Sequence, residues 1–316
     1  MVVIGKHGLL ISGGTQPLGL QLARRWTEQA RGPVLVLGVE PEDDVPLPGS
    51  VAYAQVDLTR TRDVEAVVRR EAPRRGLDTI VNLAFHRDPH REEPQLNVEA
   101  TRTFLRIARD EPGIRHLVHR STSDVYRHRG NQPDVIREDC PLDHDPTTPR
   151  WIRERVEGDA LMCAASGTCP GLTVTVLRCA EILAPRMGSQ LYDYLSSRVC
   201  LRRMGFDPML NLLSIDDAVR AFELALEHRP EGPVNVPGAD TLPLSRAIRL
   251  WGRNGLPLPS GLLGPVYYLR HRLRGSTFDY RVNLDRFHYN GVLCGQRARQ
   301  TMHYRPQTTI AWRARG

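Results

Sequence analysis

The chain has 316 residues, of which 41% are hydrophobic and 25% charged, an ordinary composition for a globular protein with a large core. Its net charge is +7, but Lys6 is the only lysine, and the 42 arginines that make up the rest of the 43 basic residues are scattered along the chain. Basic residues do not alternate with stacking aromatic residues, so we expect no nucleic-acid partner. No apolar run reaches the roughly 18 residues that a membrane span needs.

The cysteines and histidines do not form a metal-binding pattern. The six cysteines lack any CxxC or related spacing, and the eleven histidines are dispersed, so we expect no metal site. The first residues pass from a short apolar run directly into glycines, without the pattern of a signal peptide. We therefore expect a cytoplasmic protein.

Short apolar strands alternate with helical segments through the first 180 residues. The pattern predicts strands at 6–14, 33–38, 50–57, 78–85, 116–123 and 172–178, and helices at 18–30, 61–72, 97–111 and 150–165. Nearly continuous apolar strands separated by helices are typical of a parallel sheet covered on both faces. We therefore predict an α/β fold with a Rossmann-type doubly wound parallel sheet in residues 1–180.

The remainder of the chain is less regular. Residues 181–316 are predicted to form a smaller C-terminal α/β substrate lobe over the carboxyl ends of the strands, while 212–236 are expected to return to the first domain. The stretch SGLLGPVYYLRHRLRG (260–275) mixes apolar, aromatic and basic residues, as interfacial helices do. A lid helix of the substrate lobe is the commoner explanation, so we do not expect a membrane surface as a partner.

A glycine-rich turn follows the first predicted strand and opens the first helix. Backbone N–H groups and the helix dipole at such a junction can face a pyrophosphate. The predicted phosphate-binding residues are Gly13, Gly14, Thr15, Gln16, Pro17, Leu18 and Gly19.

This turn resembles the TGGxGxxG sequence of the extended short-chain dehydrogenases/reductases, the family of NAD-dependent nucleotide-sugar epimerases and dehydratases. Other segments resemble motifs of that family in the same order: VDLTR (56–60), NLAF (82–85), NVEATRTFL (97–105), RSTSDVY (120–126), LRCAEILAP (177–185), LLSIDDAVRA (212–221), VNVPG (234–238) and RQTMHYRP (299–306). Within the family the chain is most similar to a UDP-glucose-4-epimerase-like subgroup whose members do not all keep the active-site residues.

The resemblance implies a dinucleotide cofactor and a nucleotide-sugar ligand or substrate. Gln16 replaces the family's middle glycine, which we expect to weaken cofactor binding rather than abolish it. In the family an acidic residue at the end of the second strand contacts the adenosine ribose. Gly38 occupies that position here, but the side chain of Glu40 could reach back to the ribose. No arginine follows to meet a 2′-phosphate, so NAD is favoured and NADP is left open. The other implied cofactor contacts are Asp57, Leu58, Leu83, Ala84, Phe85, Asn97 and Arg155.

The family's catalytic YxxxK pair falls on Trp151 and Arg155. An indole N–H is too weak an acid for proton transfer, and an arginine has no neighbouring phenol to activate. Thr122 keeps the hydroxyl of the family's serine/threonine position, and Glu181 replaces an asparagine that often contacts substrate. The resemblance therefore implies a degenerate active site.

Three hypotheses of function remain open from the sequence, and the least favoured is the interaction or membrane-surface protein that the stretch 260–275 suggests. The first is a catalytically impaired or non-catalytic binder of cofactor or nucleotide sugar. The second is an epimerase, dehydratase or reductase with a substitute acid, for which Glu181 is the best placed; His86 is a loop alternative, whereas Tyr126 and His119 are expected to be core residues. The family commonly dimerises through helices that correspond to 97–111 and 150–165, so a homodimer is also expected.

Overall fold

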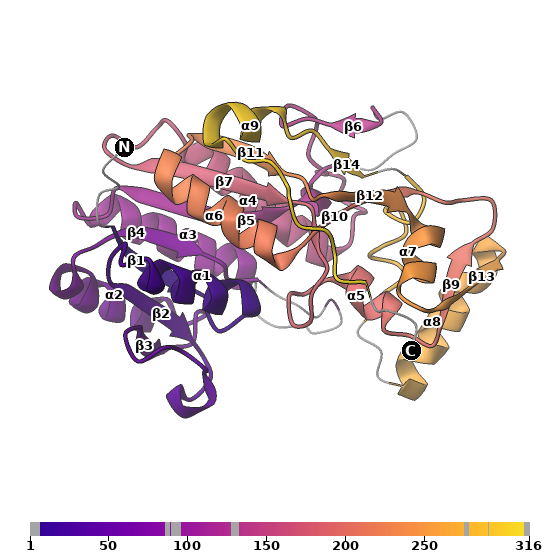
Figure 1. Ribbon diagram of the computed structural model, residues 1–316, viewed down its shortest axis with the longest axis horizontal. Helices are drawn as coiled ribbons and strands as arrows, with labels where there is room; N and C mark the ends of the chain where they lie inside the picture. The colour runs from indigo at the N-terminus through magenta and orange to yellow at the C-terminus, as the bar shows by residue number, and fades with distance from the viewer. Residues whose placement is uncertain are drawn as a thin grey trace.

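The computed structural model describes residues 7–85, 89, 96–127, 133–274, 278–289 and 291–312. A seven-stranded parallel sheet in the order β11-β7-β5-β4-β1-β2-β3 forms its centre (Figure 1). Its strands are β1 (Gly8–Ser12), β2 (Val34–Gly38), β3 (Ala52–Gln55), β4 (Leu77–Asn82), β5 (His116–Thr122), β7 (Thr173–Cys179) and β11 (Gly232–Val236). The strand order reverses between β1 and β4, and ligands of such sheets bind in the crevice at this switch point.

Helices cover both faces of this sheet. One face carries α1 (Pro17–Glu28), α6 (Ile215–His228) and α9 (Gln296–Met302), and the other α2 (Thr61–Arg75), α3 (Leu96–Asp110) and α4 (Arg150–Ala165). Apolar residues at helical spacing explain the packing: Leu18, Leu22 and Trp26 of α1 are all buried on one side of that helix. The predicted α/β doubly wound fold is confirmed. Besides α6 and β11, the structure also places α9 on this domain.

A smaller lobe begins directly after β7, at the carboxyl end of the sheet (Figure 1). Its core combines leucines with a cluster of aromatic residues, in which Tyr194 packs against Phe278 and Phe287 with ring centroids 5.2 and 4.9 Å away. The lobe contains β8 (Glu181–Ile182), α5 (Gln190–Leu195), β9 (Val199–Arg203), β10 (Met209–Leu213), β12 (Asp240–Pro243), α7 (Leu244–Leu250), β13 (Asn254–Leu258) and α8 (Ser260–Arg274).

Four short elements complete the chain: two single-turn helices, η1 (Glu42–Asp44) and η2 (Ser123–Val125), and a pair of strands, β6 (Val135–Ile136) and β14 (Val292–Leu293). The turn η2 follows β5 at the carboxyl end of the sheet, where its Asp124 forms an ion pair with Arg286 of the smaller lobe. It therefore contributes to the site between the two parts. Within the described ranges, no helix is long and apolar enough to cross a membrane.

Candidate functional site

The glycine turn lies between β1 and α1, at the switch point of the sheet. Gly13 has a φ of 61°, in the left-handed region that favours glycine. A Cβ on Gly19 would lie 2.4 Å from the Cα of Gly14, so only glycine lets α1 approach the turn this closely. Because α1 begins at Pro17, the N–H groups of its first turn have no carbonyl partner inside the helix and are available to an anion.

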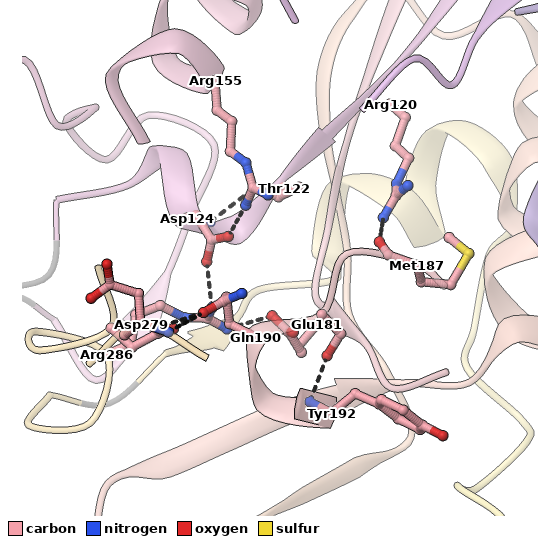
Figure 2. A network of polar contacts seen from close by, with 12 residues as sticks. Arg120, Thr122, Asp124, Arg155, Glu181, Met187, Gln190, Tyr192, Asp279 and Arg286 are labelled. Atoms are coloured by element: carbon pink, nitrogen blue, oxygen red, sulfur yellow. Dashed lines mark hydrogen bonds and ion pairs between the residues drawn. The ribbon is translucent and has the colours of Figure 1, made fainter. Parts of the chain in front are cut away.

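The side chain of Gln16 is turned inward from this turn. Its Oε1 accepts a hydrogen bond of 3.3 Å from Nη1 of Arg120 on β5, and both side chains are buried. The Arg120 guanidinium also lies 4.3 Å from the ring centroid of Phe85 and donates to the carbonyl of Met187 at 3.1 Å (Figure 2). This Arg120–Gln16 bridge therefore runs from the end of β5 to the turn after β1, across the crevice.

The adenosine side of the crevice is built around the end of β2. A Cβ on Gly38 would meet the Thr15 side chain at 2.4 Å and Oε2 of Glu40 at 3.2 Å, so the absence of a side chain at Gly38 lets the Glu40 carboxylate lie over the strand end. The same Glu40 oxygen is buried without a hydrogen-bond partner. A buried acceptor of this kind is available to a ribose hydroxyl.

Two further residues predicted on this side have local roles. Asp57 accepts hydrogen bonds from the backbone N and the hydroxyl of Thr59, at 2.9 and 2.7 Å, and these bonds lower the pKa of its carboxyl. The side chain of Leu58 is buried in the core. Asp57 therefore shapes the turn that leads into α2 while it remains exposed at the carboxyl end of β3.

The chain after β4 lines the crevice with its backbone. Leu83 N donates to Ser12 O at 3.0 Å, and a Cβ on Gly13 would lie 3.0 Å from both Cα and N of Ala84. Leu83, Ala84 and Phe85 are all buried. The backbone of this segment thus lies directly against the glycine turn. The next residue, His86, lies outside the described residues.

Trp151 and Arg155 lie together on α4, and both are buried. The Arg155 guanidinium stacks 3.2 Å from the ring centroid of Trp151 and 3.9 Å from that of Phe85, and Nη1 forms a short ion pair with Asp124. Burial lowers the pKa of Arg155 to about 9, although Asp124 and Glu181 oppose the change, so the side chain stays charged at neutral pH. Arg155 is thus held as a cation between two aromatic rings and a carboxylate.

Arg286 joins the smaller lobe to the same carboxylate. Its Nη1 lies 3.0 Å from Oδ1 of Asp124, and its Nη2 lies 2.5 Å from Oε2 of Glu181 (Figure 2). Gln190 positions the segment that carries Arg286, because its Oε1 accepts from Asp279 N at 2.9 Å and from Asn283 Nδ2 at 3.1 Å. We call Arg286 with Asp124 and Glu181 the Arg286 clasp. It connects η2 and β8 to the C-terminal part of the lobe.

A small cleft lies at this place, and the residues that line it include Arg120, Thr122, Arg155 and Glu181. The Thr122 hydroxyl accepts from Asp124 N at 3.2 Å and so caps η2. Asn97 lines an adjoining hollow with Phe85 and Arg155. Among the described residues that line these two hollows, none is a tyrosine or a lysine, so they contain no phenol–amine pair.

Tyr126 is fully buried in the core, whereas His119 is buried and lines the same hollow as Asn97 and Arg155. Tyr126 donates to Asn235 Oδ1 at 2.6 Å and accepts from Arg178 at 3.0 Å, and burial raises its pKa well above the usual range. His119 lies 3.2 Å from Asn82 Nδ2, and burial lowers its pKa to about 4, which keeps the ring neutral. Neither group has a pKa near 7, where an acid/base catalyst works best.

The structure brings together several site residues that sequence reasoning missed. Arg120 and Asp124 belong to the segment RSTSDVY, where charged residues at the end of a buried strand were a usable signal. Arg286 and Tyr289, which lines a second hollow beside Glu181, come from an irregular segment distant in sequence. No local pattern marks them.

A glycine turn at the switch point of a doubly wound sheet defines the molecule as a nucleotide-binding α/β protein. A family model described as "NAD dependent epimerase/dehydratase family" matches residues 9–236, and the chain belongs to that family. Uncharacterized proteins of Mycobacterium tuberculosis and Mycobacterium bovis are 26% identical over 312 residues, which cover 95% of this chain and 80% of theirs.

Solved structures show the same fold. The UDP-glucose 4-epimerase of Thermotoga maritima, determined with UDP-glucose, is 16% identical, with a TM-score of 0.70 over 96% of this chain and 94% of that one. DesIV, a dTDP-glucose 4,6-dehydratase of Streptomyces venezuelae determined with NAD, is 20% identical, with a TM-score of 0.70 over 96% and 93%. The resemblance drawn from the sequence motifs is therefore confirmed at the level of family and fold.

Proposed function

We propose that the protein binds NAD across the β1–β4 crevice and a nucleotide sugar between its two parts, without the proton transfer of its active relatives. The glycine turn and the unpaired Glu40 oxygen fit the adenosine and pyrophosphate end of a dinucleotide. The structural neighbours include complexes with NAD and with nucleotide sugars, which supports both ligand classes. Bound NAD would supply hydride-transfer chemistry through its nicotinamide.

The observation that carries the proposal is the environment of Arg155. An acid/base pair needs a group that can lose and regain a proton near neutral pH. Here the two positions hold an indole and a guanidinium that stack on each other, and Asp124 neutralises the guanidinium. Arg155 can orient a ribose or a phosphate, but neither Trp151 nor Arg155 can shuttle a proton near neutral pH.

Binding is tested by thermal unfolding with NAD, NADH, NADP, NADPH and UDP-glucose in separate titrations. A ligand at 100 times its Kd stabilises the folded state by about 2.7 kcal/mol, so NAD or NADH should raise the Tm clearly. Glu40→Ala should weaken NAD binding about tenfold, whereas Glu42→Ala, a neighbouring exposed carboxylate, should not. If none of the four dinucleotides shifts the Tm, the proposed function is wrong.

The absence of turnover is tested by restoring the chemistry. The double variant Trp151→Tyr/Arg155→Lys reintroduces a phenol and an amine on adjacent turns of α4. It should gain NAD-dependent hydride exchange with a UDP- or dTDP-sugar, while the wild type and each single variant remain at background. Robust turnover by the wild type would show that another acid/base operates.

An enzyme with a substitute acid is the second candidate. One oxygen of Glu181, Oε1, is buried without a hydrogen-bond partner and faces the cleft beside Arg155. If Glu181 acts as the acid or base, Glu181→Gln should abolish any turnover of the wild type without changing the NAD-induced shift in Tm. Unchanged turnover in this variant would exclude the role for Glu181.

A further inference from the structure

The smaller lobe ends in a unit whose outer face is apolar. This distal unit consists of β9, β13 and α8, and the two strands pair in parallel beside the helix, at the end of the lobe away from the sheet (Figure 1). All but three of the exposed large apolar side chains in the described residues belong to it or to the turn after β9: Val199, Met204, Leu256, Leu262, Val266, Tyr268, Leu269 and Leu273. Such concentration on one surface is typical of an interaction site.

Four of these residues form a single stripe along α8. Leu262, Val266, Leu269 and Leu273 are separated by four, three and four positions, which places them on one helical face. Leu273 is 73% exposed, and Tyr268 beside the stripe is 59% exposed. The four side chains of the stripe are 39 to 73% exposed, so the described residues leave much of its apolar surface uncovered.

The neighbouring face, one position further along the chain from the stripe, fastens α8 to the lobe. Leu263 and Tyr267 are buried in the aromatic core, and the Tyr267 hydroxyl donates to the carbonyl of Leu201 at 2.9 Å. Arg270 donates to the carbonyl of Val199 at 3.0 Å. Because α8 is anchored in this way, its apolar stripe is displayed outward on a fixed support. The three described hollows beside Arg155 or Glu181 are lined by residues from outside α8.

Charge indicates the kind of partner. The distal unit contains no aspartate or glutamate in β9, β13 or α8, whereas these elements carry five arginines: Arg202, Arg203, Arg270, Arg272 and Arg274. A second copy of α8 would bring like charges together, which disfavours self-association through this face. An apolar stripe with an exposed tyrosine and flanking arginines, without any acidic residue, matches the boundary between acyl chains and anionic headgroups.

We propose that α8 docks the protein on an anionic phospholipid surface. Leu262, Val266, Leu269 and Leu273 enter the acyl boundary, Tyr268 lies at headgroup level, and the arginines of the distal unit contact lipid phosphates. This proposal does not depend on the cofactor function, because the helix lies apart from the crevice.

Co-sedimentation with vesicles tests the proposal on the full chain. The protein should sediment with vesicles rich in phosphatidylglycerol, bind at least about tenfold more weakly to pure phosphatidylcholine, and dissociate as salt is raised. Leu269→Glu/Leu273→Glu should lower binding at least about tenfold, because it charges the stripe. Leu284→Glu, at another exposed leucine of the lobe, should bind like the wild type.

A second readout reports insertion directly. In Tyr268→Trp the new indole should shift to shorter emission wavelength when phosphatidylglycerol vesicles are added, while Trp26, Trp151 and Trp251 are already buried. Circular dichroism checks that every variant is folded. Failure to bind phosphatidylglycerol vesicles at low salt would overturn the proposal, and so would equal binding by wild type and Leu269→Glu/Leu273→Glu. A dimer in solution that this double variant dissociates would also overturn it, in favour of a second copy as the occupant.

Discussion

At the scale of single residues, Arg155 is held by contacts with Trp151, Phe85 and Asp124. Arg155 keeps the positive charge of the family's lysine, but its planar guanidinium stacks between Trp151 and Phe85, which an ammonium would do less well. Asp124 then balances the buried charge. Trp151, Phe85 and Arg155 therefore form one packed unit, so a change at either 151 or 155 affects the other.

Gln16 gives a prediction at this scale. Because its side chain and the Arg120–Gln16 bridge cross the crevice, a bound dinucleotide must displace or skirt them. Gln16→Gly and Gln16→Ala should both tighten NAD binding about five- to tenfold, measured by calorimetry, since each removes the bridge and about 1 kcal/mol of a buried hydrogen bond that binding would break.

The two variants also separate the effect of side-chain volume at position 16 from the effect of backbone flexibility there. Gln16 has a φ of −75°, which any residue adopts, so alanine should do as well as glycine. Arg120→Lys keeps a cation near the crevice while it shortens the reach of the donor, and it should give an intermediate affinity. Weaker NAD binding by Gln16→Ala than by the wild type would show that the glutamine amide assists the pyrophosphate instead of obstructing it.

At the scale of elements, an internal ion pair fixes α4 to the sheet. Asp159, one turn beyond Arg155, accepts two hydrogen bonds from Arg178 of β7, at 2.7 and 3.0 Å, and a third from Ser121 of β5 at 2.5 Å. The acidic residue on the Trp151 face of α4 therefore serves the core and does not take part in proton chemistry. This contact also sets how deep Trp151 and Arg155 lie.

Removing that carboxylate should be strongly destabilising. Asp159→Ala leaves the Arg178 guanidinium buried without its partner, which costs about 3–5 kcal/mol of unfolding free energy. Glu157→Ala on the same helix removes an exposed pair with Arg102 and should cost no more than about 1 kcal/mol. Urea unfolding measures the free energy of unfolding of both variants. Equal losses of this free energy would contradict a buried role for Asp159.

The strand β5 carries two histidines that make stability depend on pH. Burial lowers the pKa of His116 to about 3 and that of His119 to about 4, from about 6.5 in the unfolded chain. The folded state thus binds fewer protons than the unfolded state below pH 6.5. Stability is present in full above that pH and is lost as pH falls towards 4, at about 1.4 kcal/mol per pH unit for each histidine.

Urea unfolding at pH 7.5 and 5.0 measures this loss. The wild type should lose about 4 kcal/mol between the two pH values from the two histidines together. His116→Gln should lose about half as much, because only His119 remains to be protonated. The exposed His144 is the control, and His144→Gln should behave like the wild type. An unchanged pH dependence in His116→Gln would exclude burial of His116 as its cause.

At the scale of the whole molecule, the Arg286 clasp connects the sheet domain to the far part of the smaller lobe. Asp124 belongs to the extension of β5, Glu181 begins the lobe, and Arg286 lies more than a hundred residues later. A ligand between the two parts meets this clasp. The clasp therefore sets how readily the lobe separates from the domain.

Disrupting the Arg286 clasp should change the rate of backbone amide hydrogen exchange in the segment that carries Arg286. Arg286→Gln removes both ion pairs, so amides of 278–289 should exchange several-fold faster in the variant, measured by mass spectrometry. Arg281→Gln changes an exposed arginine in the same segment and should leave the exchange unchanged. If both variants exchange like the wild type, packing of Phe278 and Phe287 holds the segment instead of the clasp.

Much of the fold follows from local sequence. Six of the seven strands of the main sheet and its first four helices lie where alternating apolar runs and helical spacing predict them, and the chain segment 212–236 returns to the sheet as β11 and α6. Regular elements with one apolar face can be recognised this way because burial of that face drives their formation. The placement of α9 on the sheet domain was not predicted, since seven residues give too short a pattern.

The site divides in the same way. The sequence by itself determined the family and the glycine turn, because these follow from residues at fixed spacing along the chain; the replacement of the catalytic phenol and amine stays a prediction. Only the tertiary structure decided that Arg120 meets Gln16 and that Arg286 contacts Asp124 and Glu181. Each of these contacts joins residues whose separation in the chain carries no local signal, and the packing of the sheet and the lobe alone brings them within hydrogen-bonding distance.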